Sequence, residues 1–168
     1  VFPSRNVIRI QLSDAGTGNG LRGASFNVVA ASDIVTKDGT TRLKQGEIAD
    51  TIVVGDNGYG ESQELFIGKY LLRQDEVPEY YGAILTDTPA EVDSKSNTAT
   101  PPVVDLKAQK TTMRMTVTDA LYENIPIAGA VFEVTGGNGE LVSTLRTDDN
   151  GRAVLTDLKK GITYQIHQ

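Results

Sequence analysis

The stretch Gly23-Ala24-Ser25-Phe26-Asn27-Val28 occurs a second time as Gly129-Ala130-Val131-Phe132-Glu133-Val134, at an offset of 106 residues. In both copies Ala, Phe and Val occupy every second position. This period of two is typical of a β-strand that buries one face, because successive side chains of a strand point to opposite sides. The repeated stretch therefore predicts the same buried strand in two places.

Further matches follow the repeated strand in the same order in both halves of the chain. Asp56-Asn57-Gly58 recurs as Asp149-Asn150-Gly151 at an offset of 93, and residues 70–74 (YLLRQ) recur as 164–168 (YQIHQ) at an offset of 94. The fall from 106 to 93 means that the first copy has 13 extra residues, which we place in the polar stretch 32–47. An ordered series of matches predicts two copies of one structural unit.

Strand patterns also dominate the rest of each copy. Apolar and polar residues alternate over 8–12 and again over 113–117, which predicts a further half-buried strand. Each Asn-Gly pair lies between two such runs and predicts a tight type I′ hairpin, since both residues accept positive φ. No long apolar pattern has a period of 3.6 residues and helix caps. The predicted fold class is all-β, with two tandem β-sandwich modules and few helices.

The boundary between the modules follows from the repeat. Residues 86–102 are rich in Thr, Pro, Ser and Asp and predict an irregular connection. Val103-Val104-Asp105-Leu106 predicts the last strand of module one, so we expect the modules to span 1–109 and 110–168. Module two stops at Gln168, before any counterpart of this strand, and is therefore expected to lack its closing strand. We expect either that the native protein continues or that another chain supplies the strand.

Composition argues against several classes of function. The chain is 39% hydrophobic and has a net charge of −6, with no Cys and one His, His167. Nucleic acids and anionic membranes attract clustered Lys and Arg, so the acidic balance makes both improbable partners. No apolar run reaches the ~18 residues that a membrane-spanning helix needs. Without Cys there are no disulfides or thiolate sites, and we expect no cofactor.

Three local patterns resemble functional sites, and each has a plainer alternative. Asp148-Asp149-Asn150-Gly151 could begin a calcium loop, but the later oxygen ligands at fixed spacing are missing, which favours a turn. Glu61 and Glu64 could be paired carboxylates, although exposed charges explain them better. Tyr80-Tyr81 could be an aromatic contact for a sugar or protein, or could pack across strand ends. The sequence predicts no catalytic residue and no metal site.

Taken together, these patterns resemble collagen-adhesin B-type (Cna-B) repeats and the related pilin domains of Gram-positive bacteria. The resemblance rests on the Gly-Ala-x-Phe-x-Val strands, the Asp-Asn-Gly hairpins, the Leu-x-x-Gly-x-Tyr segment at 65–70 and Val77-Pro78-x-Tyr80-Tyr81. It implies prealbumin-like, immunoglobulin-like sandwiches that act as stalks or ligand-presenting modules on the cell wall.

Many domains of the resembled family contain an isopeptide bond between a first-strand Lys and a last-strand Asn, catalysed by a buried Glu. The resemblance maps the Lys to Leu12 and Val117, the Glu to Gln74 and Gln168, and the module-one Asn to Gln109. An alkyl side chain cannot attack a carbonyl, and an amide cannot transfer the proton. We therefore predict that the bond is absent from both modules.

Two expectations about burial follow from the repeat. Phe26 and Phe132 should be equivalent buried residues. Gln74 and Gln168 lie in phase with the apolar residues of their strands and should point inward, where a buried amide needs hydrogen-bond partners.

The function implied is that of a non-catalytic structural or adhesive module, a stalk or pilin-like part of a bacterial cell-surface protein. One alternative is an adhesin that binds its ligand through the insertion at 32–47, because loops on rigid scaffolds commonly carry binding. Another is an accessory domain of a secreted hydrolase. The expected partners are a host protein or glycan, or neighbouring pilin or adhesin domains, without membrane insertion by this segment.

Overall fold

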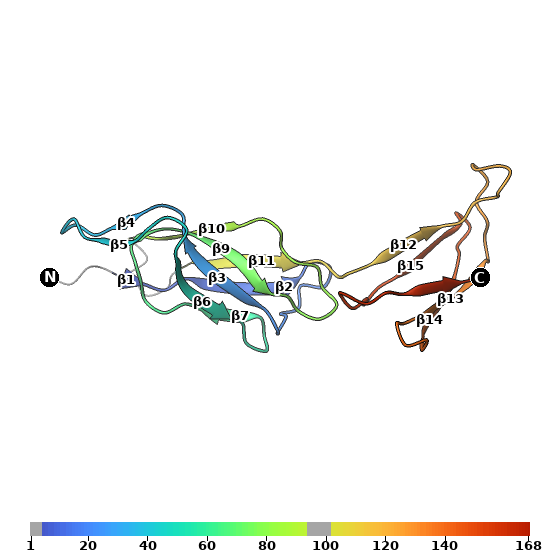
Figure 1. The fold of residues 1–168 in the computed structure, drawn as a ribbon, viewed down its shortest axis with the longest axis horizontal. Coiled ribbons are helices and arrows are strands. Elements are labelled where there is room, and N and C mark those ends of the chain that lie inside the picture. The colour runs from blue at the N-terminus through green and yellow to red at the C-terminus, as the bar shows by residue number, and fades with distance from the viewer. Residues whose placement is uncertain (1–4, 94–101) are drawn as a thin grey trace. The chain divides into compact units, whose positions relative to one another are not determined.

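The computed structural model describes residues 5–93 and 102–168, which form β-strands and no helix. The all-β prediction is confirmed. The chain divides into two compact units, which consist of residues 1–78 with 82–109 and of residues 79–81 with 110–168. Figure 1 shows the strands of both units. The short segment 79–81, which the repeat places in module one, is thus part of the second unit.

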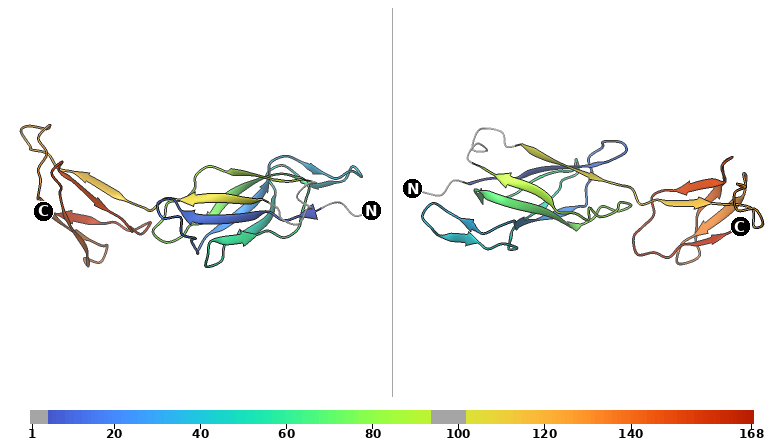
Figure 2. Two further views of the ribbon diagram at one scale, coloured as in Figure 1. Left: turned by 180° about the vertical axis from the view of Figure 1, so that it is seen from behind. Right: turned by 90° about the horizontal axis from the view of Figure 1, so that it is seen from above.

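The first unit is a sandwich of two sheets. The three-stranded sheet has the order β11-β2-β7 and contains β2 (Arg9–Asp14), β7 (Tyr59–Glu61) and β11 (Val103–Ala108). The four-stranded sheet has the order β10-β9-β3-β6 and contains β3 (Ser25–Ala30), β6 (Ile48–Val53), β9 (Gly68–Glu76) and β10 (Thr88–Val92). The sheets lie face to face in the views of Figure 2. Two short pairs are added, β1 (Arg5–Asn6) with β8 (Leu65–Phe66) and β4 (Ile34–Val35) with β5 (Thr41–Leu43).

The core of the first unit lies between these sheets. Every second residue of the central strands points inward and is buried: Ile10, Leu12, Phe26, Val28, Tyr70 and Leu72. Strand β11 runs parallel to β2, with Leu106 opposite Leu12. The predicted period of two and the predicted closing strand at 103–106 are both confirmed.

The stretch 86–102 was expected to be irregular, and this prediction is wrong for part of it. Strand β10 lies within it and pairs with β9. Ala90 and Val92 are buried, while Pro89 is itself exposed and lies on a strand at the edge of the sheet, where a proline is tolerated because no neighbouring strand needs its missing N–H. The Thr- and Pro-rich composition masked this short alternation. Residues 94–101 lie outside the described part of the chain.

The second unit repeats the central strands of the first. Its strands are β12 (Met113–Thr116), β13 (Val131–Thr135), β14 (Leu141–Arg146), β15 (Arg152–Leu155) and β16 (Gln165–His167). They form a two-stranded sheet, β12-β15, and a three-stranded sheet, β14-β13-β16. Val134, Leu145 and Ala153 form the core. Within 102–168 no strand corresponds to β10 or β11.

Hydrogen bonds confirm the repeat at atomic detail. The N–H of Leu12 donates to the carbonyl of Gly58 at 2.8 Å, and the N–H of Val117 donates to the carbonyl of Gly151 at 2.7 Å. Both glycines have positive φ, at 79° and 69°. A Cβ on either glycine would overlap the carbonyl oxygen of its strand partner. Only glycine fits these two positions.

The turn type differs from the predicted type I′. Neither Asn57 nor Asn150 has a positive φ. The N–H of Gly58 donates to the carbonyl of Gly55, three residues earlier, at 2.9 Å. This is a turn closed by a left-handed glycine, the arrangement found in hairpins with a glycine bulge. One residue with positive φ is enough to close this hairpin.

The insertion in the first unit folds as the β4–β5 hairpin, within the stretch where the repeat places it. Ile34 of β4 is buried, and its Cδ1 atom lies directly against Gly68 at the start of β9. The guanidinium groups of Arg5 and Arg42 lie 4.4 and 5.2 Å from the ring centre of Phe66. The corresponding connection in the second unit is the short turn 136–140 between β13 and β14.

Phe26 and Phe132 are equivalent in register but not in burial. Phe26 is 1% exposed, whereas Phe132 is only half-buried. The sheet that faces Phe132 has two strands in place of three, so less surface covers the ring. The prediction of equal burial is therefore wrong.

Candidate functional site

In the first unit the positions that the resemblance assigns to an isopeptide bond are occupied by packing residues. Leu12 is completely buried on β2, and the β11 residue opposite it is the buried Leu106. Gln109 lies one residue beyond β11 and is exposed. Its assignment as the last-strand position is therefore wrong, because Leu106 and Ala108 are the inward-facing residues at this end of β11.

The amide of Gln74 points into the first unit, as predicted. Gln74 lies opposite Phe26 and is half-buried. Its Oε1 atom accepts a hydrogen bond from the N–H of Ile84 at 2.6 Å. Its Nε2 atom is buried and has no hydrogen-bond partner among the described residues. The amide orders the chain after β9, but it carries no acidic proton to transfer.

In the second unit the positions that correspond to Leu12 and Gln74 are less buried. Val117 is half-buried on the same side of the chain as Met113 and Met115. Gln168 is exposed, so the prediction that it points inward is wrong. The register of β13 with β16, in which Glu133 pairs with His167, would bring Gln168 opposite Phe132. However, within 102–168 β16 pairs only with β13, and Gln168 has little structure around it to bury it.

The proposed calcium loop is a turn. Asp148 Oδ1 accepts hydrogen bonds from the N–H groups of Asn150 and Arg152, each at 2.9 Å. This carboxylate is used to shape the hairpin. Over residues 5–93 and 102–168 no group of three or more His, Cys, Asp or Glu is placed to hold a metal ion. In the same ranges no helix is long and apolar enough to cross a membrane.

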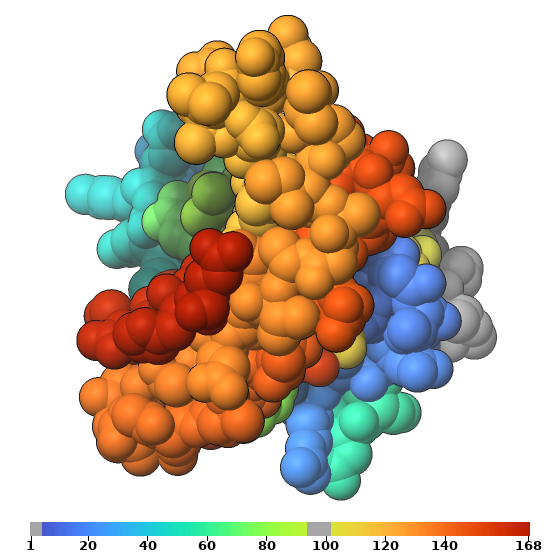
Figure 3. Space-filling model, turned by 90° about the vertical axis from the view of Figure 1, so that its right-hand side faces the viewer, coloured from blue at the N-terminus to red at the C-terminus, as the bar shows by residue number. Residues whose placement is uncertain are grey.

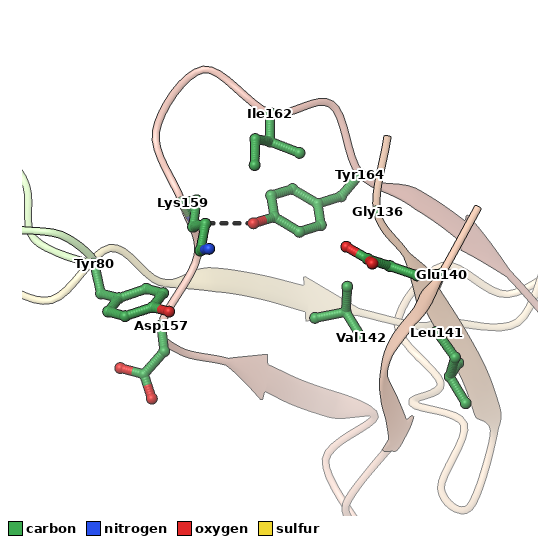
Figure 4. A pocket seen from close by; sticks show the side chains of 9 residues that line it. All are labelled: Tyr80, Gly136, Glu140, Leu141, Val142, Asp157, Lys159, Ile162 and Tyr164. Carbon is green, nitrogen blue, oxygen red and sulfur yellow. Dashed lines mark hydrogen bonds between the residues drawn. The ribbon is translucent and has the colours of Figure 1, made fainter. Parts of the chain in front are cut away.

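A cavity of about 340 Å³ opens in the second unit (Figure 4). The turn 136–140 and the start of β14 form one wall, and the loop 157–164 forms another. Tyr80 of the segment 79–81 closes a third side. In Figure 4 the side chains of Tyr164, Glu140 and Val142 face this space.

The backbone next to the cavity is strained. Tyr80 and Asp157 have φ values of 69° and 62°, and they are the only non-glycine residues with positive φ in the described part of the chain. The carbonyl of Tyr80 accepts a hydrogen bond from the N–H of Thr111 at 2.8 Å, which holds the segment in place. Strained backbone of this kind costs on the order of 1–3 kcal/mol and gathers at functional sites.

Charged groups around the cavity pair with one another. Lys159 Nζ lies 3.3 Å from Glu79 Oε1, and its hydrogen bond with Glu79 raises the pKa of Lys159. Lys110 Nζ lies 3.0 Å from Asp157 Oδ1. Lys159 Nζ also lies 5.9 Å from the ring centre of Tyr80. These pairs are exposed and contribute little to stability, but they leave the rim nearly neutral.

The tyrosine that lines the cavity has a fully buried counterpart in the first unit. The hydroxyl of Tyr70 donates to the carbonyl of Phe66 at 2.6 Å, and burial raises the pKa of Tyr70 to about 12. Tyr164 is only half-buried, and its hydroxyl oxygen accepts from the N–H of Lys159 at 2.9 Å. The β4–β5 hairpin covers this end of the first unit through Ile34, and the described residues of the second unit form no equivalent hairpin.

Sequence reasoning did not find this cavity. It singled out Tyr80-Tyr81 and left open whether these residues make a ligand contact or pack across strand ends. Tyr81 forms a bridge with Lys110, whereas Tyr80 is half-buried and lines the cavity. The absence of the 13-residue insertion from the second copy was the available signal, because it uncovers the position of Tyr164.

Two tandem sandwiches with these strand orders define the class as prealbumin-like repeats. A family model for the SpaA prealbumin-like fold domain matches residues 6–110 and again residues 111–167. The chain therefore belongs to the SpaA prealbumin-like fold domain family, as the resemblance implied. No curated protein sequence matches it.

Solved structures show the same fold at low sequence identity. Shaft pilin SpaA from Lactobacillus rhamnosus GG is 14% identical with a TM-score of 0.52, over 97% of this chain and 87% of that one. The Bacillus anthracis TIE protein is 22% identical with a TM-score of 0.50, and the match covers 98% of this chain but 28% of that protein. The chain also spans 54% of a streptococcal ancillary pilin, at 18% identity and a TM-score of 0.46. The chain spans less than two thirds of the length of the Bacillus anthracis TIE protein and of the streptococcal ancillary pilin.

Proposed function

We propose that the chain is a structural, non-catalytic, pilin-like module of a Gram-positive surface protein that lies outside the cell. The observation that carries the proposal is the presence of two copies of a SpaA-type domain in one chain. Serial copies of a small sandwich suit a stalk or shaft, because each copy adds length without adding a new chemistry. Its partners are neighbouring pilin or adhesin domains.

The proposal includes no catalysis, and the mapped positions support this. The resembled family places reactive side chains where this chain has Leu12, Val117 and Gln74. Of these, Leu12 is buried among apolar residues and Gln74 accepts a main-chain hydrogen bond. Both are used for packing and for ordering the chain, which supports a first unit that is held by non-covalent contacts without an isopeptide bond.

Immunoelectron microscopy of the bacterium that produces the protein tests the proposal. Antibodies raised against the 168-residue chain should label surface filaments or the cell wall at regular intervals. Protease treatment of whole cells should remove the label. Labelling confined to the cytoplasm would overturn the proposal.

An adhesive role of the β4–β5 hairpin is a second candidate, because the hairpin tip is ordered by its own side chains. Thr36 Oγ1 donates to Asp38 Oδ1 at 2.5 Å, and Arg42 Nη2 lies 3.2 Å from Asp38 Oδ2. The hydrogen bonds from Thr36 and Thr40 and the charge of Arg42 lower the pKa of Asp38 to about 2. A fixed, ionised loop of this kind suits recognition of a host protein or glycan.

Binding to immobilised extracellular-matrix proteins and to a glycan array tests the adhesive role. The double variant Asp38→Ala, Arg42→Ala should reduce binding, whereas Asp75→Ala, an exposed residue of β9, should not. Equal binding by all three proteins would exclude the hairpin as the contact.

A further inference from the structure

We propose that the cavity of the second unit, between Tyr80, Tyr164 and Glu140, binds a neutral saccharide of one or two sugar rings. The site is independent of the structural role proposed above. It rests on the size of the cavity, the nature of its walls, the pairing of its charges and the contrast with the first unit.

The size and the walls fit a small amphipathic ligand. A volume of about 340 Å³ lies at the lower end of the range for ligand pockets, about 300–1,000 Å³. Two tyrosine rings and the side chains of Val142 and Ile162 offer apolar surface. Tyrosine rings combine a flat apolar face with a polar edge, which matches a sugar ring with its C–H face and its hydroxyl rim.

The charges disfavour ionic ligands. Lys159, the cation nearest to Tyr80, already lies over this ring, so a ligand cation at that face would be repelled. The carboxylates of Glu140 and Asp157 line the same space and repel an anion. Lys159 pairs with Glu79, and Asp157 pairs with Lys110. A neutral ligand can therefore bind without electrostatic repulsion and without breaking either ion pair.

The hydrogen-bonding groups suit hydroxyls, which both donate and accept. The hydroxyl of Tyr164 accepts from Lys159 N–H, and its own proton has no acceptor in the described residues. The hydroxyl of Tyr80 likewise has no hydrogen bond there. The carboxylate of Glu140 receives only one exposed bond, from Asn138 Nδ2 at 3.2 Å. Two free donors and a free acceptor therefore converge on one space.

The first unit shows that the fold does not require an open cavity at this place. There the matching Tyr70 is 1% exposed and its hydroxyl is bonded to the main chain. The β4–β5 hairpin covers that end, with Ile34 against Gly68. In the second unit the short turn 136–140 takes the place of the hairpin, and Gly136 and Glu140 of this turn line the cavity. The position of Tyr164 is thus open in the second unit, whereas the matching position of Tyr70 is closed in the first.

Titration of the ¹⁵N-labelled 168-residue chain by NMR tests the proposal. The probes are N,N′-diacetylchitobiose, cellobiose and lactose, each up to about 20 mM, which would reveal a Kd of a few mM. At least one should cause saturable shifts of the amides of 136–142 and 157–164. Choline chloride and sodium glucuronate are the charged counter-probes and should leave these amides unchanged.

Variants link the shifts to the cavity. Tyr80→Ala removes one aromatic wall and should weaken binding about tenfold. Glu140→Gln, a change in an exposed turn that keeps the shape of the side chain, should weaken it as well. Tyr122→Ala, which removes an exposed tyrosine of the loop after β12, should leave binding unchanged.

Three results would overturn the proposal. One is the absence of saturable shifts with all three disaccharides. Another is that choline or glucuronate shifts the same amides at lower concentration, which would indicate an ion site. The third is that Tyr80→Ala and Glu140→Gln both bind as tightly as the unchanged chain.

Discussion

Single residues fix the turns of both copies, and glycine is the clearest case. Gly58 and Gly151 both have positive φ, and they approach equivalent carbonyl groups, those of Leu12 and Val117. The aromatic positions are less constant, because Phe26 is buried and Phe132 is half-buried. Backbone geometry is thus preserved between the copies more closely than side-chain burial.

Replacing Gly58 or Gly151 by Ala should destabilise its own unit. The new Cβ would overlap a carbonyl oxygen, and alanine disfavours positive φ. We expect a loss of about 2–4 kcal/mol in urea unfolding. Gly39 has a φ of 80° with no atom near its Cβ position, so Gly39→Ala is the control and should cost about 1 kcal/mol. Equal losses at Gly39 and Gly58 would show that steric overlap plays no part.

Tyr70 should make the first unit sensitive to alkali. Burial raises its pKa in the folded state to about 12, above the value of about 10 in an unfolded chain. The stabilising contribution is therefore complete below about pH 10 and is lost as the pH rises toward 12. The free energy of unfolding should fall over this range, and Tyr70→Phe should flatten the fall. An unchanged slope in Tyr70→Phe would contradict the assignment.

At the scale of the elements, sequence periodicity predicted the strands that carry alternating apolar residues. The strands at 8–12 and 23–28 with their copies, and the single strand at 103–106, could be predicted because burial on one face leaves a period of two. Strand β10 could not, because it begins with Thr and Pro and only two of its residues, Ala90 and Val92, are apolar and buried. The cavity could not either, since it depends on how the turn 136–140 packs, which has no periodic signature.

The β4–β5 hairpin should be anchored by Ile34 and not by its tip. Ile34→Ala would leave a void against Gly68, and we expect a loss of about 2–4 kcal/mol. Asp38→Ala lies at the exposed tip and should change the stability of the first unit by less than about 0.5 kcal/mol. Calorimetry of the two variants distinguishes these roles. A larger loss for Asp38→Ala would mean that the tip holds the hairpin.

At the scale of the whole molecule, the two units differ in how completely their sheets enclose the core. The first encloses its core between sheets of three and four strands, whereas the second has two and three strands in the described residues. Figure 3 looks onto the second unit, where the loop after β12 and the strand β16 lie at the surface. Leu121 and Tyr122 in this loop are 85% and 65% exposed. The second unit should be the less stable one.

Calorimetry should resolve two unfolding transitions, with the second unit melting first. Phe26→Ala should lower the temperature of the upper transition, because its ring is fully buried. The corresponding loss in the free energy of unfolding is about 3–5 kcal/mol. Phe132→Ala should affect only the transition at lower temperature. The loss in the free energy of unfolding should be about half as large, because the ring of Phe132 is half-exposed. If Phe132→Ala shifted the upper transition, the assignment of the two transitions to the two units would be wrong.

We propose that packing alone, without a covalent cross-link, holds both sandwiches. Leu12 and Val117 stand where a nucleophilic lysine would be needed, and Gln74 stands where the acid would be needed. The most direct test is the intact mass of the purified 168-residue chain, measured by electrospray mass spectrometry under denaturing conditions. Without a cross-link, the chain should have the mass of its sequence. A mass lower by one ammonia or one water per unit would reveal an isopeptide bond and contradict the proposal.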